Sequence, residues 1–319
     1  SLLLIVVLGS SAVAGTMVHD SGWFTWGLYD GTKLSSGPKI ANKNVMSDGW
    51  LYESPTLPTA MADFAVCQYS GRIYLSGGYT GSACLADVRY AAATTGNPID
   101  TWTPIQPLPS PVRDHAMVVA DRFLYVLGGH TTGAPTADVF VNELKFDGSH
   151  LGWQVSAGSL PEALWSHRAV NVAGFLVVIG GSTGSDEHTA TAAVRVTGID
   201  RNGTITGWSS GPDLPAPRTG HAVVTTQNRI WVLGGADSLG AETASVYYAD
   251  LDPATGVLTP WQIGADLPVP VREHTAAVSN GIILVIGGHV ESRMYATTAV
   301  HKCKIQPDLS LGAWQPGFY

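Results

Sequence analysis

Residues 108–129 read LPSPVRDHAMVVADRFLYVLGG, and residues 267–288 repeat the arrangement as LPVPVREHTAAVSNGIILVIGG. Each stretch has a Leu-Pro pair, a polar triplet, two short apolar runs separated by a turn, and a double glycine. Apolar runs of this length around a two-residue turn predict a β-hairpin. The double glycine predicts a sharp turn or the close approach of another backbone.

The same arrangement recurs along most of the chain at a nearly constant interval. Leu-Pro begins at positions 57, 108, 160, 214 and 267, and a double glycine follows each of these leucines by 20 residues. A tryptophan follows each double glycine by 25 to 28 residues, and Trp50 extends the tryptophan series backwards by one period. Repetition at a period of about 50 residues predicts an array of similar structural units.

Every unit is strand-like throughout. After the double glycine come a longer loop, a third apolar run such as DVFVNELKF (138–146), and a turn that leads to the tryptophan. Four antiparallel strands per unit, without helical periodicity, predict an all-β fold, a six-bladed β-propeller of four-stranded antiparallel blades in a single domain. The expected blades cover approximately residues 1–56, 57–107, 108–159, 160–213, 214–266 and 267–319 of the domain 1–319.

The motif Leu-Pro-x-x-Arg-x-x-His, the double glycine and the later tryptophan resemble the kelch repeat, over residues 57–319. The resemblance implies a kelch-type propeller, and kelch-like propellers mostly act as binding platforms for proteins or glycans. A six-bladed kelch-like propeller is also similar to the fold of bacterial exported sialic acid mutarotases. That second likeness is one of fold, because no motif of those enzymes can be matched here residue by residue.

The first blade departs from the repeat, and two layouts fit it. In one, SAVAGTMVHDSGWFTWGLYDG (11–31) supplies the first two strands, with Trp26-Gly27 in place of the double glycine. In the other, LLLIVVLGS (2–10) is the strand that ends in the double glycine elsewhere.

The apolar N-terminus also resembles the end of a secretory signal, because Ala-Val-Ala follows the apolar run. We interpret it as a buried strand; the alternatives are a leftover leader or a strand donated to a neighbouring subunit. Donation through residues 1–10 would give a homo-oligomer. The run is too short to span a bilayer, so we expect no membrane span.

Composition narrows the range of partners. Charged residues make up 13% of the 319 residues and the net charge is −8, without a run of Lys or Arg, which argues against nucleic acid as a partner. The low charge is typical of secreted proteins, so we expect an extracellular, periplasmic or cell-surface location. Three cysteines without a CxxC spacing predict buried thiols and no zinc site, although Cys67 and Cys84 remain candidates for a disulfide.

The loops predict where a ligand would bind. We call the strands of a blade a to d from the centre outward, the loop from d to the next a the DA loop, and the loop from b to c the BC loop. Because strands alternate in direction, all DA and BC loops lie on one face, and the BC loops differ most between blades. A rigid scaffold with variable loops on one side predicts a binding face there.

Candidate ligand contacts sit in these loops. A histidine stands seven residues after the leucine in four units, and the repeat explains it as scaffold, although ligand contact is an alternative. The four histidines come from different blades, so we expect no metal site. The arginines are less regular and suit an anionic or carbonyl-bearing ligand. The candidates are Arg113, Arg218 and Arg272, the ring residues His115, His167, His221 and His274, and the residues after the double glycine, Tyr79, His130 and His289.

Three functions follow as hypotheses. The first is a secreted or surface-exposed binding module that uses the DA and BC loops to hold a protein or glycan. The second is an exported sugar mutarotase or isomerase acting on an anionic sugar, for which Arg and His at a channel mouth would suit proton transfer. The third is a self-assembling surface or fibre subunit. No set of catalytic residues can be assigned and no cofactor is expected, so the binding module is favoured over an enzyme.

Overall fold

The structure is a computed structural model that describes residues 57, 59–92, 101–145, 150–290, 295–297 and 299–317. Before residue 57 it describes the backbone of four strands, β1 (Leu2–Leu8), β2 (Val13–His19), β3 (Leu28–Tyr29) and β4 (Leu34–Ser35).

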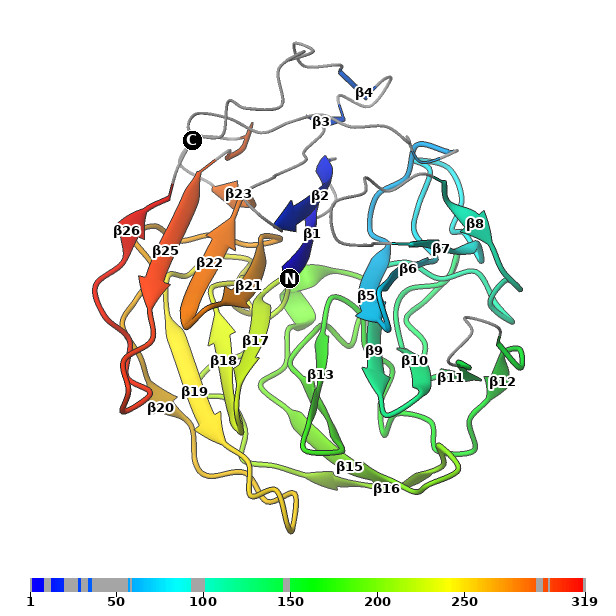
Figure 1. The fold of residues 1–319 in the computed structure, drawn as a ribbon. Helices are drawn as coiled ribbons and strands as arrows, with labels where there is room; N and C mark the ends of the chain where they lie inside the picture. The colour runs from blue at the N-terminus through cyan, green and yellow to red at the C-terminus, as the bar shows by residue number, and fades with distance from the viewer. Residues whose placement is uncertain are drawn as a thin grey trace.

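Five four-stranded antiparallel blades are arranged around a central axis (Figure 1). The inner strands are β5 (Ala65–Tyr69), β9 (Ala116–Ala120), β13 (Arg168–Val172), β17 (Ala222–Thr226) and β21 (Thr275–Ser279). The second strands are β6 (Arg72–Ser76), β10 (Phe123–Leu127), β14 (Phe175–Ile179), β18 (Arg229–Leu233) and β22 (Ile282–Ile286). The third strands are β7 (Val88–Ala92), β11 (Val139–Glu143), β15 (Val194–Ile199), β19 (Val246–Asp250) and β25 (Val300–Lys304). The outer strands are β8 (Thr103–Pro104), β12 (Gln154–Val155), β16 (Ile205–Ser210), β20 (Gln262–Ile263) and β26 (Gln315–Pro316).

Two short elements lie in BC loops. The 3₁₀ helix η1 (Glu187–Thr189) follows β14, and the small hairpin of β23 (His289–Val290) and β24 (Tyr295–Ala296) follows β22.

The inner strands form a closed circle. Each contacts the inner strand of the next blade, from β5 through β9, β13 and β17 to β21, and β1 contacts both β21 and β5. Figure 1 shows β1, paired with β2, between β21 and β5. The prediction of four-stranded propeller blades is therefore confirmed for five blades. Of the sixth, the structure shows β1 to β4 and no four-stranded sheet, while Trp50 and Trp26-Gly27 lie outside the described residues.

The position of β1 bears on both interpretations of the N-terminus. Residues 2–8 form a strand, as predicted, and they take the innermost position rather than that of the second strand, which the second layout gave them. Because this strand lies in the circle of its own chain, the packing gives no support to the idea that it completes a neighbour's sheet. In the described part of the chain, no helix has the length and apolarity needed to cross a membrane.

The core lies between neighbouring blades, and the repeated tryptophans join them. In four blades the indole N–H donates to a backbone carbonyl of the preceding blade, at 2.9 to 3.3 Å. The pairs are Trp153 with Gln106, Trp208 with Gly158, Trp261 with Pro212, and Trp314 with Ala265. Cys67, Cys84 and Cys303 are free thiols, so the candidate disulfide between the first two is absent.

Candidate functional site: the axial cavity and the loops around it

The DA loops are tied to one another by a chain of backbone hydrogen bonds around the axis. In each of the five blades the residue before the ring position has a left-handed backbone, with φ from 49° to 58°. In the last four of these blades the N–H of this residue donates to the carbonyl of its counterpart in the preceding blade, at 2.7 to 3.1 Å. The chain runs through Asp63, Asp114, Ser166, Gly220 and Glu273. This arrangement places three acidic side chains, one serine and one glycine around one opening.

The four ring histidines lie between blades. His115, His167, His221 and His274 are at most 4% exposed, and the Cε1 edge of each faces the first glycine of the preceding blade's double glycine. The next glycine of each pair donates its N–H to a DA-loop carbonyl of the following blade. Burial lowers the pKa of His115, His167 and His274 to about 3. The rings are therefore neutral joints between blades at neutral pH, and a ligand contact for them remains a prediction.

The residue after each double glycine holds the DA and BC loops together, which confirms that these loops share a face. A β-bridge joins Arg113 to His130, and another joins His130 to Pro135. Similar pairs of bridges, centred on Tyr79, Ser182 and Ala236, occur in three other blades. His130 also meets the Trp165 ring of the next blade edge-on, with centroids 5.6 Å apart. Loops joined in this way form a rigid surface.

Two of the three candidate arginines reach across to the preceding blade. Arg113 lies over the Tyr79 ring, 4.9 Å from its centroid. Arg272 Nε lies 3.5 Å from Oε1 of Glu242. The same oxygen is hydrogen-bonded to Nδ1 of His289 at 2.6 Å. Both arginines are about a quarter exposed, so they border the binding face while also bridging blades.

Arg218 takes a different course. It is 4% exposed and its guanidinium donates to Ser245 Oγ and, at 2.9 Å, to the hydroxyl of Tyr247 in β19. It stands one residue earlier in the loop than Arg113 and Arg272, and a shift by one residue turns a side chain to the other side of an extended segment. The structure therefore places Arg218 inside its own blade, away from the axis.

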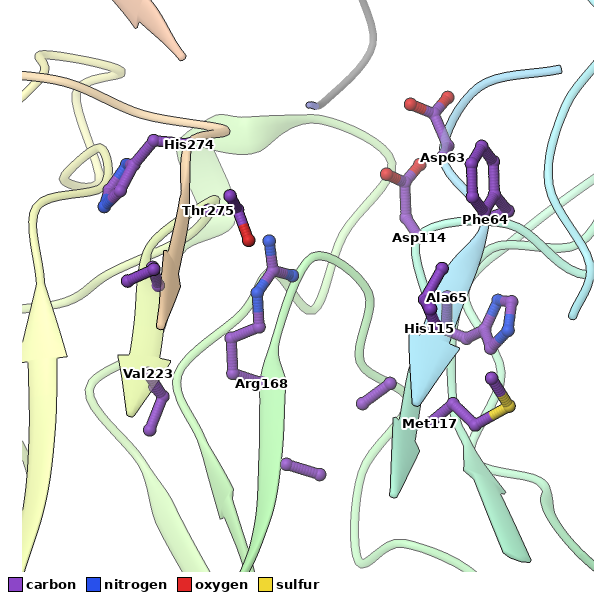
Figure 2. Close-up of a pocket in the computed structure, with 15 residues that line it drawn as sticks. Asp63, Phe64, Ala65, Asp114, His115, Met117, Arg168, Val223, His274 and Thr275 are labelled. Carbon is purple, nitrogen blue, oxygen red and sulfur yellow. The ribbon is translucent and has the colours of Figure 1, made fainter. Parts of the chain in front are cut away.

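A cavity of about 280 Å³ opens at the axis, lined by the starts of the inner strands (Figure 2). The first residue of each inner strand lines it: Ala65, Ala116, Arg168, Ala222 and Thr275. Four of these are small, and the fifth extends a guanidinium into the space that they leave, as Figure 2 shows. Asp63 and Asp114 also line the cavity.

The two aspartates share one cation. Arg113 Nη1 lies 3.1 Å from Asp114 Oδ2 and 3.5 Å from Asp63 Oδ2. Asp63 Oδ1 is buried and has no hydrogen-bond partner. Burial raises the pKa of Asp63, and burial together with the nearby Asp63 and Glu273 raises the pKa of Asp114 well above its ordinary value, although Arg113 and Arg168 act in the opposite direction.

Of the sequence-predicted candidates, His115 and His274 line this cavity, but sequence reasoning missed its charged residues. Arg168, Asp63 and Asp114 were not among the candidates, which were the ring histidines, the DA-loop arginines and the residues after the double glycines. A signal existed in the sequence: Arg168 breaks a series in which the residue after the ring position is alanine in three of five units. A repeat predicts the scaffold, so a departure from it at an inward-facing position indicates a specific role.

Comparisons with known proteins agree with the repeat. Residues 166–308 match the KLHDC2/KLHL20/DRC7 kelch-repeats domain model. Beta-scruin of Limulus polyphemus is 29% identical over 198 residues, 60% of this chain and 21% of that protein. Alpha-scruin of the same organism is 27% identical over 248 residues, 75% of this chain and 26% of that protein. The kelch-like protein terF of Aspergillus terreus is 24% identical over 309 residues, 93% of this chain and 64% of that protein.

A solved structure shares the architecture. The structure of YjhT superposes with a TM-score of 0.63 and 17% sequence identity, covering 82% of this chain and 84% of that one. The chain spans about a quarter or less of the length of the scruins, so their similarity concerns the repeats. Together these findings show kelch repeats arranged as a β-propeller.

Proposed function

We propose that this kelch-repeat β-propeller is a secreted or surface-exposed binding module whose ligand, a protein or a glycan, is held on the face formed by the DA and BC loops. One observation supports this above the others. The loops of that face are fixed to one another by β-bridges and by the backbone hydrogen bonds around the axis, yet each blade presents different side chains there. A rigid frame with varied loops is the usual architecture of a recognition surface.

Binding arrays can test which face is used. Labelled protein is applied to a glycan array and a peptide array, and two exposed apolar residues are changed in turn. Leu239→Asp alters a BC loop, where the side chain is 79% exposed, and Val257→Asp alters the turn before β20 on the other face, where it is 65% exposed. We expect Leu239→Asp to weaken the wild-type signals at least tenfold, because a charge is buried without a partner in the complex. Val257→Asp should leave them unchanged. Equal effects of both variants, or no binder on either array, would contradict the proposal.

An exported anionic-sugar mutarotase is the second candidate, and Asp114 is the observation that favours it. A carboxyl group whose pKa lies well above its ordinary value is a stronger base than an ordinary carboxylate, and ring opening of a sugar requires proton transfer. The guanidinium of Arg168 in the same cavity would suit a carboxylate.

Anomer exchange of N-acetylneuraminic acid, followed by NMR, tests that candidate. Wild-type protein should accelerate exchange above the spontaneous rate and Asp114→Asn should abolish at least nine-tenths of the acceleration, because an amide cannot transfer the proton. Spontaneous rates with the wild-type protein would remove the candidate.

A further inference from the structure

The axial cavity is lined by groups of opposite charge that bond to other partners rather than to each other. Arg168 donates to the carbonyl of His167 at 3.1 Å, while the ion pairs of Asp63 and Asp114 go to Arg113. Arg168 nevertheless lowers the pKa of Asp114 through space, so its charge and the carboxylates act on the same region. A cation and a carboxylate pair therefore border one cavity with room between them.

An unsatisfied acceptor lies on the carboxylate side. Asp63 lines the cavity, its side chain is 2% exposed, and its Oδ1 is buried without any donor. A buried acceptor without a partner is energetically costly, and the cost is higher when the acceptor is charged. An ammonium group from a ligand would supply donors to the carboxylate of Asp63. It would also offset the negative charge of the two aspartates, which have only the cation of Arg113 as an ion-pair partner.

Arg168, by contrast, needs an acceptor from the ligand. Its one hydrogen bond to the His167 carbonyl uses a single N–H, and the planar guanidinium offers a pair of parallel donors that match a carboxylate. Figure 2 shows this group extending from β13 into the space that Asp63 and Asp114 border.

Size limits what can enter. At about 280 Å³ the cavity lies just below the range of roughly 300–1,000 Å³ typical of small-molecule sites. Alanine, valine and threonine make up most of the remaining lining residues, with Phe64, Met117, His115 and His274 among them, so only a small ligand fits between the charged groups. We propose that the axial cavity binds a small aliphatic zwitterion of the amino-acid class, with its ammonium group at Asp63 and Asp114 and its carboxylate at Arg168.

Calorimetric titration with a graded series of probes tests this site. The probes are glycine, β-alanine and γ-aminobutyrate, with butylamine and butyrate as ligands that carry one charge each. We expect at least one amino acid to bind at least tenfold more tightly than both singly charged compounds, because only it satisfies both ends. Equal affinity for butylamine, or no binding of any amino acid, would overturn the zwitterion site.

Two variants separate the ends of the ligand. Arg168→Ala installs the residue that Ala65, Ala116 and Ala222 provide at the same strand position, so the fold should persist while amino-acid affinity falls at least tenfold. Asp63→Asn should lower it by a similar factor. The matched control is Asp121→Asn, since Asp121 has the same left-handed backbone (φ 54° against 56°) but is exposed in the turn between β9 and β10.

Unchanged amino-acid affinity in Arg168→Ala, in protein that is folded by circular dichroism, would contradict the assignment. The array experiment with Leu239→Asp reports on the loop face independently, so failure of the cavity proposal leaves the binding-module proposal standing and the reverse also holds.

Discussion

Lowering the pH from 6.5 to 4.5 is expected to reduce the free energy of unfolding by about 2–3 kcal/mol for each ring histidine that stays neutral in the folded protein. The folded pKa of His115, His167 and His274 is about 3, below the ordinary value of 6.5. Between these two pKa values the unfolded chain therefore binds protons at these histidines and the folded protein does not. This stability is fully present above pH 6.5 and is lost as the pH falls toward 3.

Two carboxyl groups oppose this trend in part. The pKa values of Asp63 and Asp114 are raised, so the folded protein binds protons at these sites more readily than the unfolded chain does. Their unfavourable contribution near neutral pH is relieved as the pH falls through their folded values. They are two groups against several buried histidines, so the net change is destabilising.

Urea unfolding at half-unit pH steps measures the effect. His167→Phe keeps an aromatic ring at the position that Phe64 occupies in another blade, and it should flatten the slope of unfolding free energy against pH by about one proton. His188→Gln is the control, because the side chain of His188 is 68% exposed, and it should leave the slope unchanged. A His167→Phe slope equal to that of the wild type would show that this histidine is not a neutral joint.

Gly180→Ala is expected to lower the free energy of unfolding by about 3 kcal/mol or more. Gly180 has φ +57°, and a Cβ there would lie 2.5 Å from the Arg218 carbonyl oxygen and 3.0 Å from His221 Cε1. The blades would have to separate at this joint. Chemical denaturation followed by tryptophan fluorescence measures the loss.

Gly174→Ala in the same blade is the matched comparison. Its φ is +88°, but nothing lies within 4 Å of the added Cβ, so only backbone strain applies, at about 1–2 kcal/mol. Equal losses in the two variants would mean that the close approach of the blades contributes nothing.

The strands of each blade could be predicted because their signal is local. HAMVVA and RFLYVLGG became β9 (Ala116–Ala120) and β10 (Phe123–Leu127), paired in register across the turn that the sequence indicated. The tryptophan strand was less accurate: β12 starts one residue after Trp153, whose indole reaches the preceding blade instead. Local pattern cannot show a contact with a residue about 50 positions away.

The axial cavity could not be predicted for a related reason. Asp63, Asp114 and Arg168 meet because three units about 50 residues apart place equivalent positions around one axis, and the size of the space depends on all the inner strands together. The sequence did indicate the face and the importance of the DA loops. It could not show that Arg218 turns into its own blade while Arg168, in a strand, faces the axis.

The backbone hydrogen bonds around the axis hold neighbouring blades together without using the side chains that a ligand would meet. Because N–H and C=O groups of residues such as Asp114 and Ser166 make these bonds, the bonds do not depend on which side chains stand at these positions. The left-handed φ restricts them to residue types that tolerate it, which leaves glycine, serine and acidic side chains open to exchange. A propeller built in this way can acquire a new ligand by substitution at the axis, at little risk to its closure.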